Sequence, residues 1–146
     1  MFNEFFQEQW PLFVAVVVVV AMLIYSYVGD KIAGYKSVNT DAATRLYNDD
    51  AFVLDVRSAS EYKEGHIGNA VNISSTEVAS NMAKLPKDKE APVLVYCLSG
   101  ARSARVASTM AKNGYTNVSN LAGGINAWKA AGLPVGREKS KKNKKK

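Results

Sequence analysis

The longest apolar run of the chain lies near its N-terminus. From Leu12 to Val28 the sequence reads LFVAVVVVVAMLIYSYV, 17 residues without a charge, and Trp10 and Pro11 extend the uncharged stretch to 19. A helix rises about 1.5 Å per residue, so this stretch would span roughly 28 Å, close to the thickness of a bilayer core. Trp10 lies at one edge and two tyrosines at the other, where interfacial aromatics are enriched. The pattern predicts a transmembrane helix at 12–28, embedded in the lipid bilayer, after a short N-terminal segment at 1–11.

Two other structures produce an apolar run near an N-terminus. A buried core helix rarely runs so far without a polar stripe. A cleaved signal peptide needs basic residues before the run, whereas Glu4 and Glu8 are the only charged residues there. Lys31 and Lys36 follow the run. The positive-inside rule therefore predicts a single-pass protein of the cell (inner) membrane, with its N-terminus outside and its C-terminal domain in the cytoplasm.

After a linker expected at 29–36, short apolar runs alternate with segments of helical character as far as Val135. Strands are expected at 52–56, 70–73, 92–96 and 118–121, with another beginning at Val38. Helices are expected at 41–47, 59–63, 76–84, 103–113 and 125–130. Alternation of this kind is typical of an α/β domain with a mainly parallel sheet. The sequence thus predicts one such domain at 37–135.

The net charge of +6 belongs to the C-terminal tail rather than to the domain. From Arg137 to Lys146 there are seven basic residues and one acidic residue, and the rest of the chain holds 12 of each. We expect residues 136–146 to be disordered, either as a solvated extension or in contact with anionic lipid headgroups. Contact of the tail with RNA or the ribosome is a further alternative by the same charge logic, but no specific nucleic-acid binding is predicted.

The chain has one cysteine, Cys97, so it cannot form an intramolecular disulfide, which fits a reducing compartment. Cys97 directly follows the apolar run 92–96, at the strand end where parallel α/β sheets bind ligands. Gly100 permits a tight loop, and unpaired amides of the next helix are expected to point back at the sulfur and to favour a thiolate. Arg102 is suited to binding an oxyanion. The alternative is a buried structural cysteine; no metal site and no cofactor is predicted.

Four segments of the domain resemble, in the right order, the signatures of single-domain rhodaneses. They are Leu54-Asp55-Val56-Arg57 with Glu61-Tyr62, Gly65-His66-Ile67 with Ala70-Val71-Asn72-Ile73, Cys97-x-x-Gly100-x-Arg102-Ser103, and Leu121-Ala122-Gly123-Gly124-Ile125 with Trp128. The sequence departs from the family at Asn69 and Ser74, which replace a usual glycine and proline outside the reactive loop. The resemblance implies a five-stranded parallel sheet flanked by helices, here preceded by the transmembrane helix.

The resemblance also implies sulfur transfer. The Cys97 thiolate would take a sulfane sulfur from a small sulfur-containing anion such as thiosulfate and pass it, as a persulfide, to a thiol or protein acceptor. The loop C-x4-R is one residue shorter than the C-x5-R loop of related phosphatases. In this interpretation Cys97 is catalytic, and substrate is bound by Leu98, Ser99, Gly100, Ala101, Arg102 and Ser103. Structural roles fall to Asp55, Arg57, His66 and Trp128. The alternative function is a membrane-tethered interaction or scaffold module of the same family, with little turnover.

Overall fold

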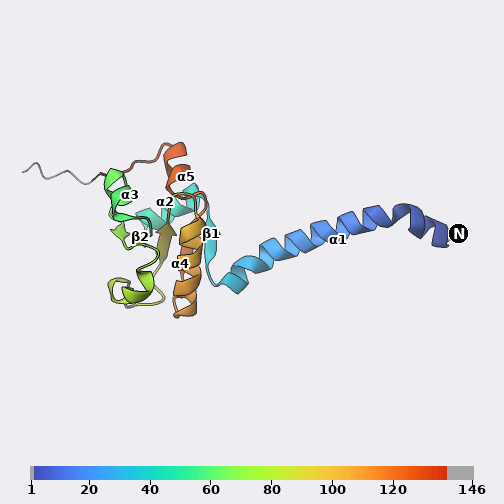
Figure 1. Cartoon of the computed structure of the whole chain (residues 1–146), viewed down its shortest axis with the longest axis horizontal. Helices are drawn as coiled ribbons and strands as arrows, with labels where there is room; N and C mark the ends of the chain where they lie inside the picture. The colour runs from blue at the N-terminus through green and yellow to red at the C-terminus, as the bar shows by residue number, and fades with distance from the viewer. Residues whose placement is uncertain (1, 138–146) are drawn as a thin grey trace, which may run out of the picture. The chain divides into compact units, whose positions relative to one another are not determined.

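The computed structural model describes residues 2–137, apart from the side chain of Asp30 (Figure 1). The chain divides at Ala33 into an N-terminal unit and a C-terminal unit, and each is described by itself. Residues 138–146, which contain most of the predicted basic tail, lie outside the described residues.

The N-terminal unit is one helix, α1 (Phe2–Ala33), of 32 residues. Its length and its mean hydropathy of 2.6 over the most apolar window are sufficient to cross a membrane. The helix is longer at both ends than the predicted span 12–28, since it includes residues 2–11 and the first part of the expected linker. It ends where Gly34 adopts a positive φ of 74°, a conformation that glycine allows at no steric cost.

The C-terminal unit contains the predicted parallel sheet. Its strands are β1 (Lys36–Val38), β2 (Phe52–Asp55), β3 (Val71–Asn72), β4 (Val93–Tyr96) and β5 (Val118–Leu121). The five strands are all parallel in the order β1-β5-β4-β2-β3, which confirms the predicted α/β architecture. The helices are α2 (Thr40–Asn48), α3 (Ala59–Glu64), α4 (Ala101–Lys112) and α5 (Gly124–Ala130), with 3-10 turns η1 (Val78–Ser80) and η2 (Met82–Lys84).

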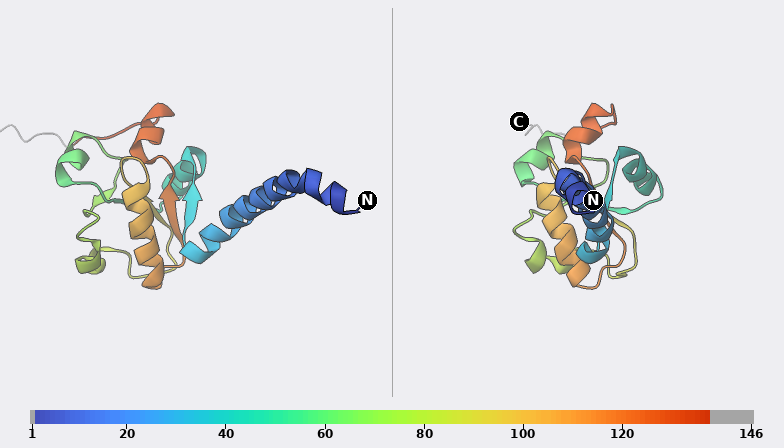
Figure 2. Two further views of the ribbon diagram at one scale, coloured as in Figure 1. Left: turned by 45° about the vertical axis from the view of Figure 1, so that its right-hand side comes forward. Right: turned by 90° about the vertical axis from the view of Figure 1, so that its right-hand side faces the viewer.

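Helices cover both faces of the sheet, as a sheet buried on both sides requires. Side chains alternate along β4: Val93, Val95 and then Cys97 pack with residues of α4, while Leu94 and Tyr96 pack with residues of α2 and α5. Figure 2 shows α4 and α2 on opposite sides of the domain. Cys97 therefore enters the layer between the sheet and α4.

The predicted helix at 76–84 is wrong, because the structure has the two short 3-10 turns η1 and η2 there. The side chains of Ser80 and Asn81 both donate hydrogen bonds to the carbonyl of Glu77, at 3.0 and 2.8 Å. Side chains that bond to nearby backbone groups in this way compete with a regular helix. Asn39 caps α2, and its side-chain oxygen accepts the amide of Ala42. The strand predicted to begin at Val38 instead ends there, as β1.

Candidate functional site

The reactive loop, residues 97–103, joins the end of β4 to the first turn of α4. Gly100 precedes α4 with φ 102°, a left-handed conformation that turns its amide inward. This amide donates a hydrogen bond to Sγ of Cys97 at 3.0 Å, and the hydroxyl of Ser103 donates to the same sulfur at 3.4 Å. Cys97 is only 1% exposed. The sulfur is therefore buried against donors and not against apolar side chains alone.

These donors determine the ionisation of the thiol. Burial by itself raises the pKa of Cys97, because a charged thiolate loses water. Hydrogen bonds from the Ser103 side chain and from the amides of Ser103, Gly100 and Ser99 oppose this effect and stabilise the thiolate. The net result is a Cys97 pKa lowered from its usual value. A lowered pKa gives more of the nucleophilic form at neutral pH.

Asn120, on β5, supports the loop from below and was missed by sequence reasoning. Its side-chain oxygen accepts a hydrogen bond from the Ser103 hydroxyl at 2.6 Å, and its side-chain amide donates to the carbonyl of Gly100 at 3.3 Å. The signal in the sequence was a polar pair, Ser119 and Asn120, inside a strand whose residues are all buried. Such a pair needs internal hydrogen-bond partners.

The start of α5 holds the outer side of the loop. The amides of Ile125 and Asn126 donate to the carbonyls of Cys97 and Leu98 at 2.9 and 3.2 Å. This approach requires glycine at position 124, where φ is 58° and where a Cβ would overlap the carbonyl oxygen of Cys97. The carbonyls of Cys97 and Leu98 thus face α5, while the amide of Gly100 faces the sulfur.

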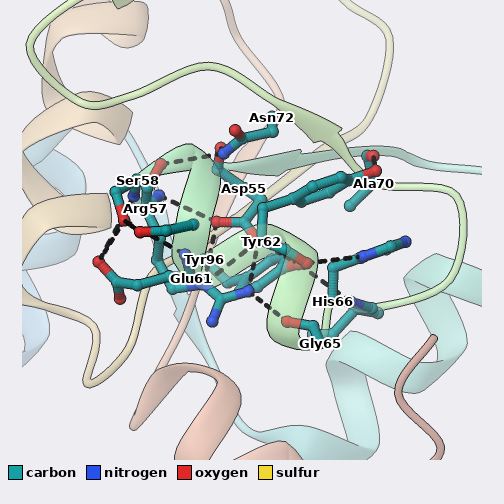
Figure 3. Close-up of polar contacts among 12 residues, drawn as sticks. Asp55, Arg57, Ser58, Glu61, Tyr62, Gly65, His66, Ala70, Asn72 and Tyr96 are labelled. Atoms are coloured by element: carbon teal, nitrogen blue, oxygen red, sulfur yellow. Dashed lines mark hydrogen bonds and ion pairs between the residues drawn. The ribbon is translucent and has the colours of Figure 1, made fainter. Parts of the chain in front are cut away.

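Arg102 does not point freely into solution in this structure. Its Nη1 and Nη2 donate to the two carboxylate oxygens of Glu61 at 3.1 and 3.2 Å. Glu61 is also held by the Ser58 hydroxyl, which donates to the carboxylate at 3.1 Å (Figure 3). The hydrogen bonds that the Glu61 carboxylate accepts from Arg102 lower the pKa of Glu61. The local sequence pattern groups Glu61 with Asp55 and Arg57, whereas its ion-pair partner Arg102 lies 41 residues away.

Asp55 and Arg57 form a buried ion pair. Arg57 Nη2 lies 2.7 Å from Asp55 Oδ2 and donates a second bond to the carbonyl of Gly65. The Tyr96 hydroxyl donates to the same Asp55 oxygen at 2.7 Å and accepts the amide of Ile67 at 3.0 Å. Figure 3 shows Tyr96 and Arg57 converging on Asp55. Burial raises the pKa of Tyr96, so it remains a donor. The network ties β2 and β4 to the turn at Gly65.

His66 and Trp128 are both engaged away from the reactive loop. The His66 ring stacks on Tyr62 with centroids 3.9 Å apart, and Nδ1 lies 3.0 Å from the Tyr62 carbonyl oxygen. The backbone of His66 also exchanges two hydrogen bonds with Gly136. Trp128 is buried and donates from Nε1 to the carbonyl of Pro134 at 2.9 Å. Both side chains thus make their contacts within the scaffold, and their structural roles stay predictions.

The remaining loop residues, Leu98, Ser99 and Ala101, are exposed, and Leu98 is 41% exposed. They form the outer rim above Cys97 and contribute no charge. Their part in substrate binding stays a prediction. Within residues 2–137, no group of three or more His, Cys, Asp or Glu side chains is placed to hold a metal ion.

Comparisons with known proteins agree with this geometry. Residues 39–131 match the family model described as the rhodanese-like domain. A sulfurtransferase from Allochromatium vinosum is 37% identical over 87 residues, which are 60% of this chain and 79% of that protein. The thiosulfate sulfurtransferase GlpE of Coxiella burnetii is 38% identical over 97 residues, 66% of this chain and 89% of that protein. The crystal structure of a rhodanese-related protein from Thermoplasma volcanium matches with a TM-score of 0.62 and 33% identity, covering 71% of this chain and 100% of that one.

Proposed function

The chain belongs to the rhodanese-like family, and on this premise we propose that it is a membrane-anchored sulfurtransferase that moves sulfane sulfur through a persulfide on Cys97. One observation carries the proposal. The amide of Gly100 and the hydroxyl of Ser103 both donate to the Cys97 sulfur, and these bonds lower its pKa despite burial. A structural thiol has no need of such donors.

The proposed reaction is a double displacement. The Cys97 thiolate attacks the outer sulfur of thiosulfate, the sulfur–sulfur bond of the donor breaks, and sulfite leaves with the bonding electron pair. The product is a persulfide anion on Cys97, whose terminal sulfur then passes to a thiolate or to cyanide and regenerates the Cys97 thiolate. With one cysteine in the chain, the acceptor is another molecule. The amides that stabilise the thiolate would also stabilise the persulfide and the departing thiolate.

Arg102 is the proposed binding group for the anionic part of the donor. It is the one basic residue between Cys97 and Ser103. A planar guanidinium offers two parallel donors to an oxyanion. Leu98, Ser99, Gly100, Ala101 and Ser103 complete the proposed binding loop through their backbone and, at Ser103, through the hydroxyl.

The proposed anchor is α1, with the lipid bilayer at residues 12–28 and the sulfurtransferase domain in the cytoplasm. The apolar composition of α1 supports the anchor, and the lysines after the span support the orientation. A cytoplasmic location also suits a thiol that must stay reduced. Carbonate extraction of membranes tests the anchor, and protease digestion of intact spheroplasts tests the orientation.

The function is tested on the full chain purified in detergent. Incubation with thiosulfate should add about 32 Da, one sulfur atom, to the peptide containing Cys97, and cyanide should remove it as thiocyanate. A Cys97→Ser variant with an unchanged circular dichroism spectrum should neither gain the mass nor release thiocyanate. A wild-type chain that takes sulfur from no donor would refute the enzyme and favour an interaction module.

A further inference from the structure

The charged groups at the reactive loop are Arg102, Glu61 and the Cys97 thiolate, and together they carry a net negative charge. Arg102 supplies one positive charge, and the Glu61 carboxylate that contacts it supplies one negative charge. The thiolate of Cys97 adds a second negative charge. The outer loop residues, Leu98, Ser99 and Ala101, carry none. In its reactive state the site therefore has a net charge of −1, although its most evident polar residue is an arginine.

The next cation in the neighbourhood cannot change this balance. Arg57 is 3% exposed and already donates to Asp55 and to the carbonyl of Gly65. Its charge is matched by the buried Asp55 carboxylate, with Nη2 and Oδ2 2.7 Å apart. Arg57 is thus committed to the fold, and Arg102 is left as the proposed contact for a donor.

Glu61 is also fixed in place rather than free to swing aside. It is the third residue of α3 and forms a capping box with Ser58: the Ser58 hydroxyl accepts the Glu61 amide at 3.3 Å, and the carboxylate accepts the Ser58 amide at 3.5 Å. A second bond from the Ser58 hydroxyl reaches the same carboxylate. An anion that binds Arg102 must therefore displace or share a carboxylate that α3 holds against the guanidinium.

We propose that Glu61 is a specificity-determining residue. It occupies Arg102 in the resting site and selects against compact dianionic donors such as thiosulfate. The favoured donors are those of lower charge, namely monoanionic persulfides and thiosulfonates. This inference rests on the proposed sulfurtransferase function. The physical reason is Coulombic: the net charge of −1 at the site repels an anionic donor, and this repulsion doubles when the donor charge changes from −1 to −2. The natural donor class would be a persulfide carried on a thiol.

Two sulfur donors of matched chemistry test the proposal. Thiosulfate is a dianion that releases sulfite, and methanethiosulfonate is a monoanion that releases methanesulfinate; both transfer one sulfane sulfur to the thiolate. The measured quantity is kcat/KM for each donor with cyanide as acceptor, on the full chain in detergent. In Glu61→Gln the ratio of thiosulfate to methanethiosulfonate should rise about threefold to fivefold, the range expected of a partly exposed charge pair.

The glutamine variant preserves the local fold, because glutamine also serves at the third position of a capping box. Glu64→Gln is the matched control: it removes the same charge from the same helix at an exposed position, and the donor ratio should stay at its wild-type value. An unchanged ratio in Glu61→Gln, or an equal rise in both variants, would overturn the role of Glu61. If the wild type accepts sulfur from neither donor, the proposed function itself has failed.

A measurement on the wild type alone keeps the proposal falsifiable should Glu61→Gln not fold. Salt screens repulsion between the donor and the site, and it does so more for a dianion than for a monoanion. The ratio of thiosulfate to methanethiosulfonate should therefore rise as ionic strength is raised. A ratio that falls with added salt would mean that the site attracts dianions, and it would overturn the inference.

Discussion

The backbone amide of Ile125 donates a hydrogen bond to the carbonyl oxygen of Cys97 at 2.9 Å. The two residues lie on different elements, one in the first turn of α5 and the other directly after β4. This bond fixes the backbone of Cys97 against α5, while the Cys97 sulfur accepts the amide of Gly100 within the loop. The position of the nucleophile thus depends on a helix that follows it by 28 residues along the chain.

Gly124→Ala should unfold or strongly destabilise the domain. The new Cβ would overlap the Cys97 carbonyl oxygen, and φ is 58° there. We expect a loss of about 3 kcal/mol or more in the free energy of unfolding, combining steric overlap with left-handed strain. Gly132→Ala is the control, since φ is +74° but nothing lies within 4 Å of the added Cβ; it should cost only about 1–2 kcal/mol. Urea titration measures both, and equal losses would contradict the close approach.

Ser103→Ala should slow the reaction of Cys97 with iodoacetamide at neutral pH. The hydroxyl bond stabilises the thiolate, so its loss raises the pKa of Cys97 and leaves less of the reactive form below that pKa. One such bond is worth about 1 kcal/mol, which predicts a rate about fivefold lower. The pH profile of alkylation should move to higher pH in this variant. Ser108→Ala, further along α4, should keep the wild-type profile; a Ser103→Ala profile that does not move would refute the assigned role.

Arg102→Ala should weaken donor binding more than it slows the chemical step. The guanidinium is proposed to hold the anionic group that leaves with its electrons, and removal of such a binding contact raises KM with a smaller change in kcat. A KM increase of about tenfold is expected for a methanethiosulfonate donor, equivalent to one lost charge-assisted contact. Arg105→Ala, one turn along the exposed side of α4, serves as the control for general loss of positive charge. A large fall in kcat with KM unchanged would assign Arg102 to the chemistry instead.

Tyr96→Phe should destabilise the domain without changing the reactivity of Cys97. The hydroxyl donates to Asp55 and accepts from the amide of Ile67, and both buried groups would lose that partner. The expected cost is about 2 kcal/mol, the penalty for leaving buried polar groups unsatisfied. Tyr115→Phe removes a single hydroxyl bond, to the carbonyl of Pro86, and should cost less. Denaturant titration gives the stabilities, and an altered alkylation profile in Tyr96→Phe would contradict a purely structural role.

Most helices and strands could be predicted from the sequence, because secondary structure depends largely on residues that are close along the chain. The apolar run that forms most of α1, the strand β5 and the place of Cys97 after β4 all follow from hydrophobic pattern and flanking residues. Gly114 and Gly132 follow the ends of α4 and α5 with positive φ, at 92° and 74°, as glycine after a helix commonly does. The exception at 76–84 arose where side chains of Ser80 and Asn81 compete for backbone partners, an effect that periodicity does not measure.

Only the tertiary structure decided which distant groups meet at the sulfur. The amino-acid sequence by itself determined a membrane-length helix, an alternating α/β pattern and a cysteine loop rich in donors. It did not determine that Glu61 would contact Arg102 across 41 residues, or that Asn120 would lie under Ser103. These contacts arise because parallel strands bring their C-terminal ends to one edge of the sheet, so residues far apart in the chain share one small volume. The charge of the site is therefore a property of the fold, whereas the nucleophile is a property of the sequence.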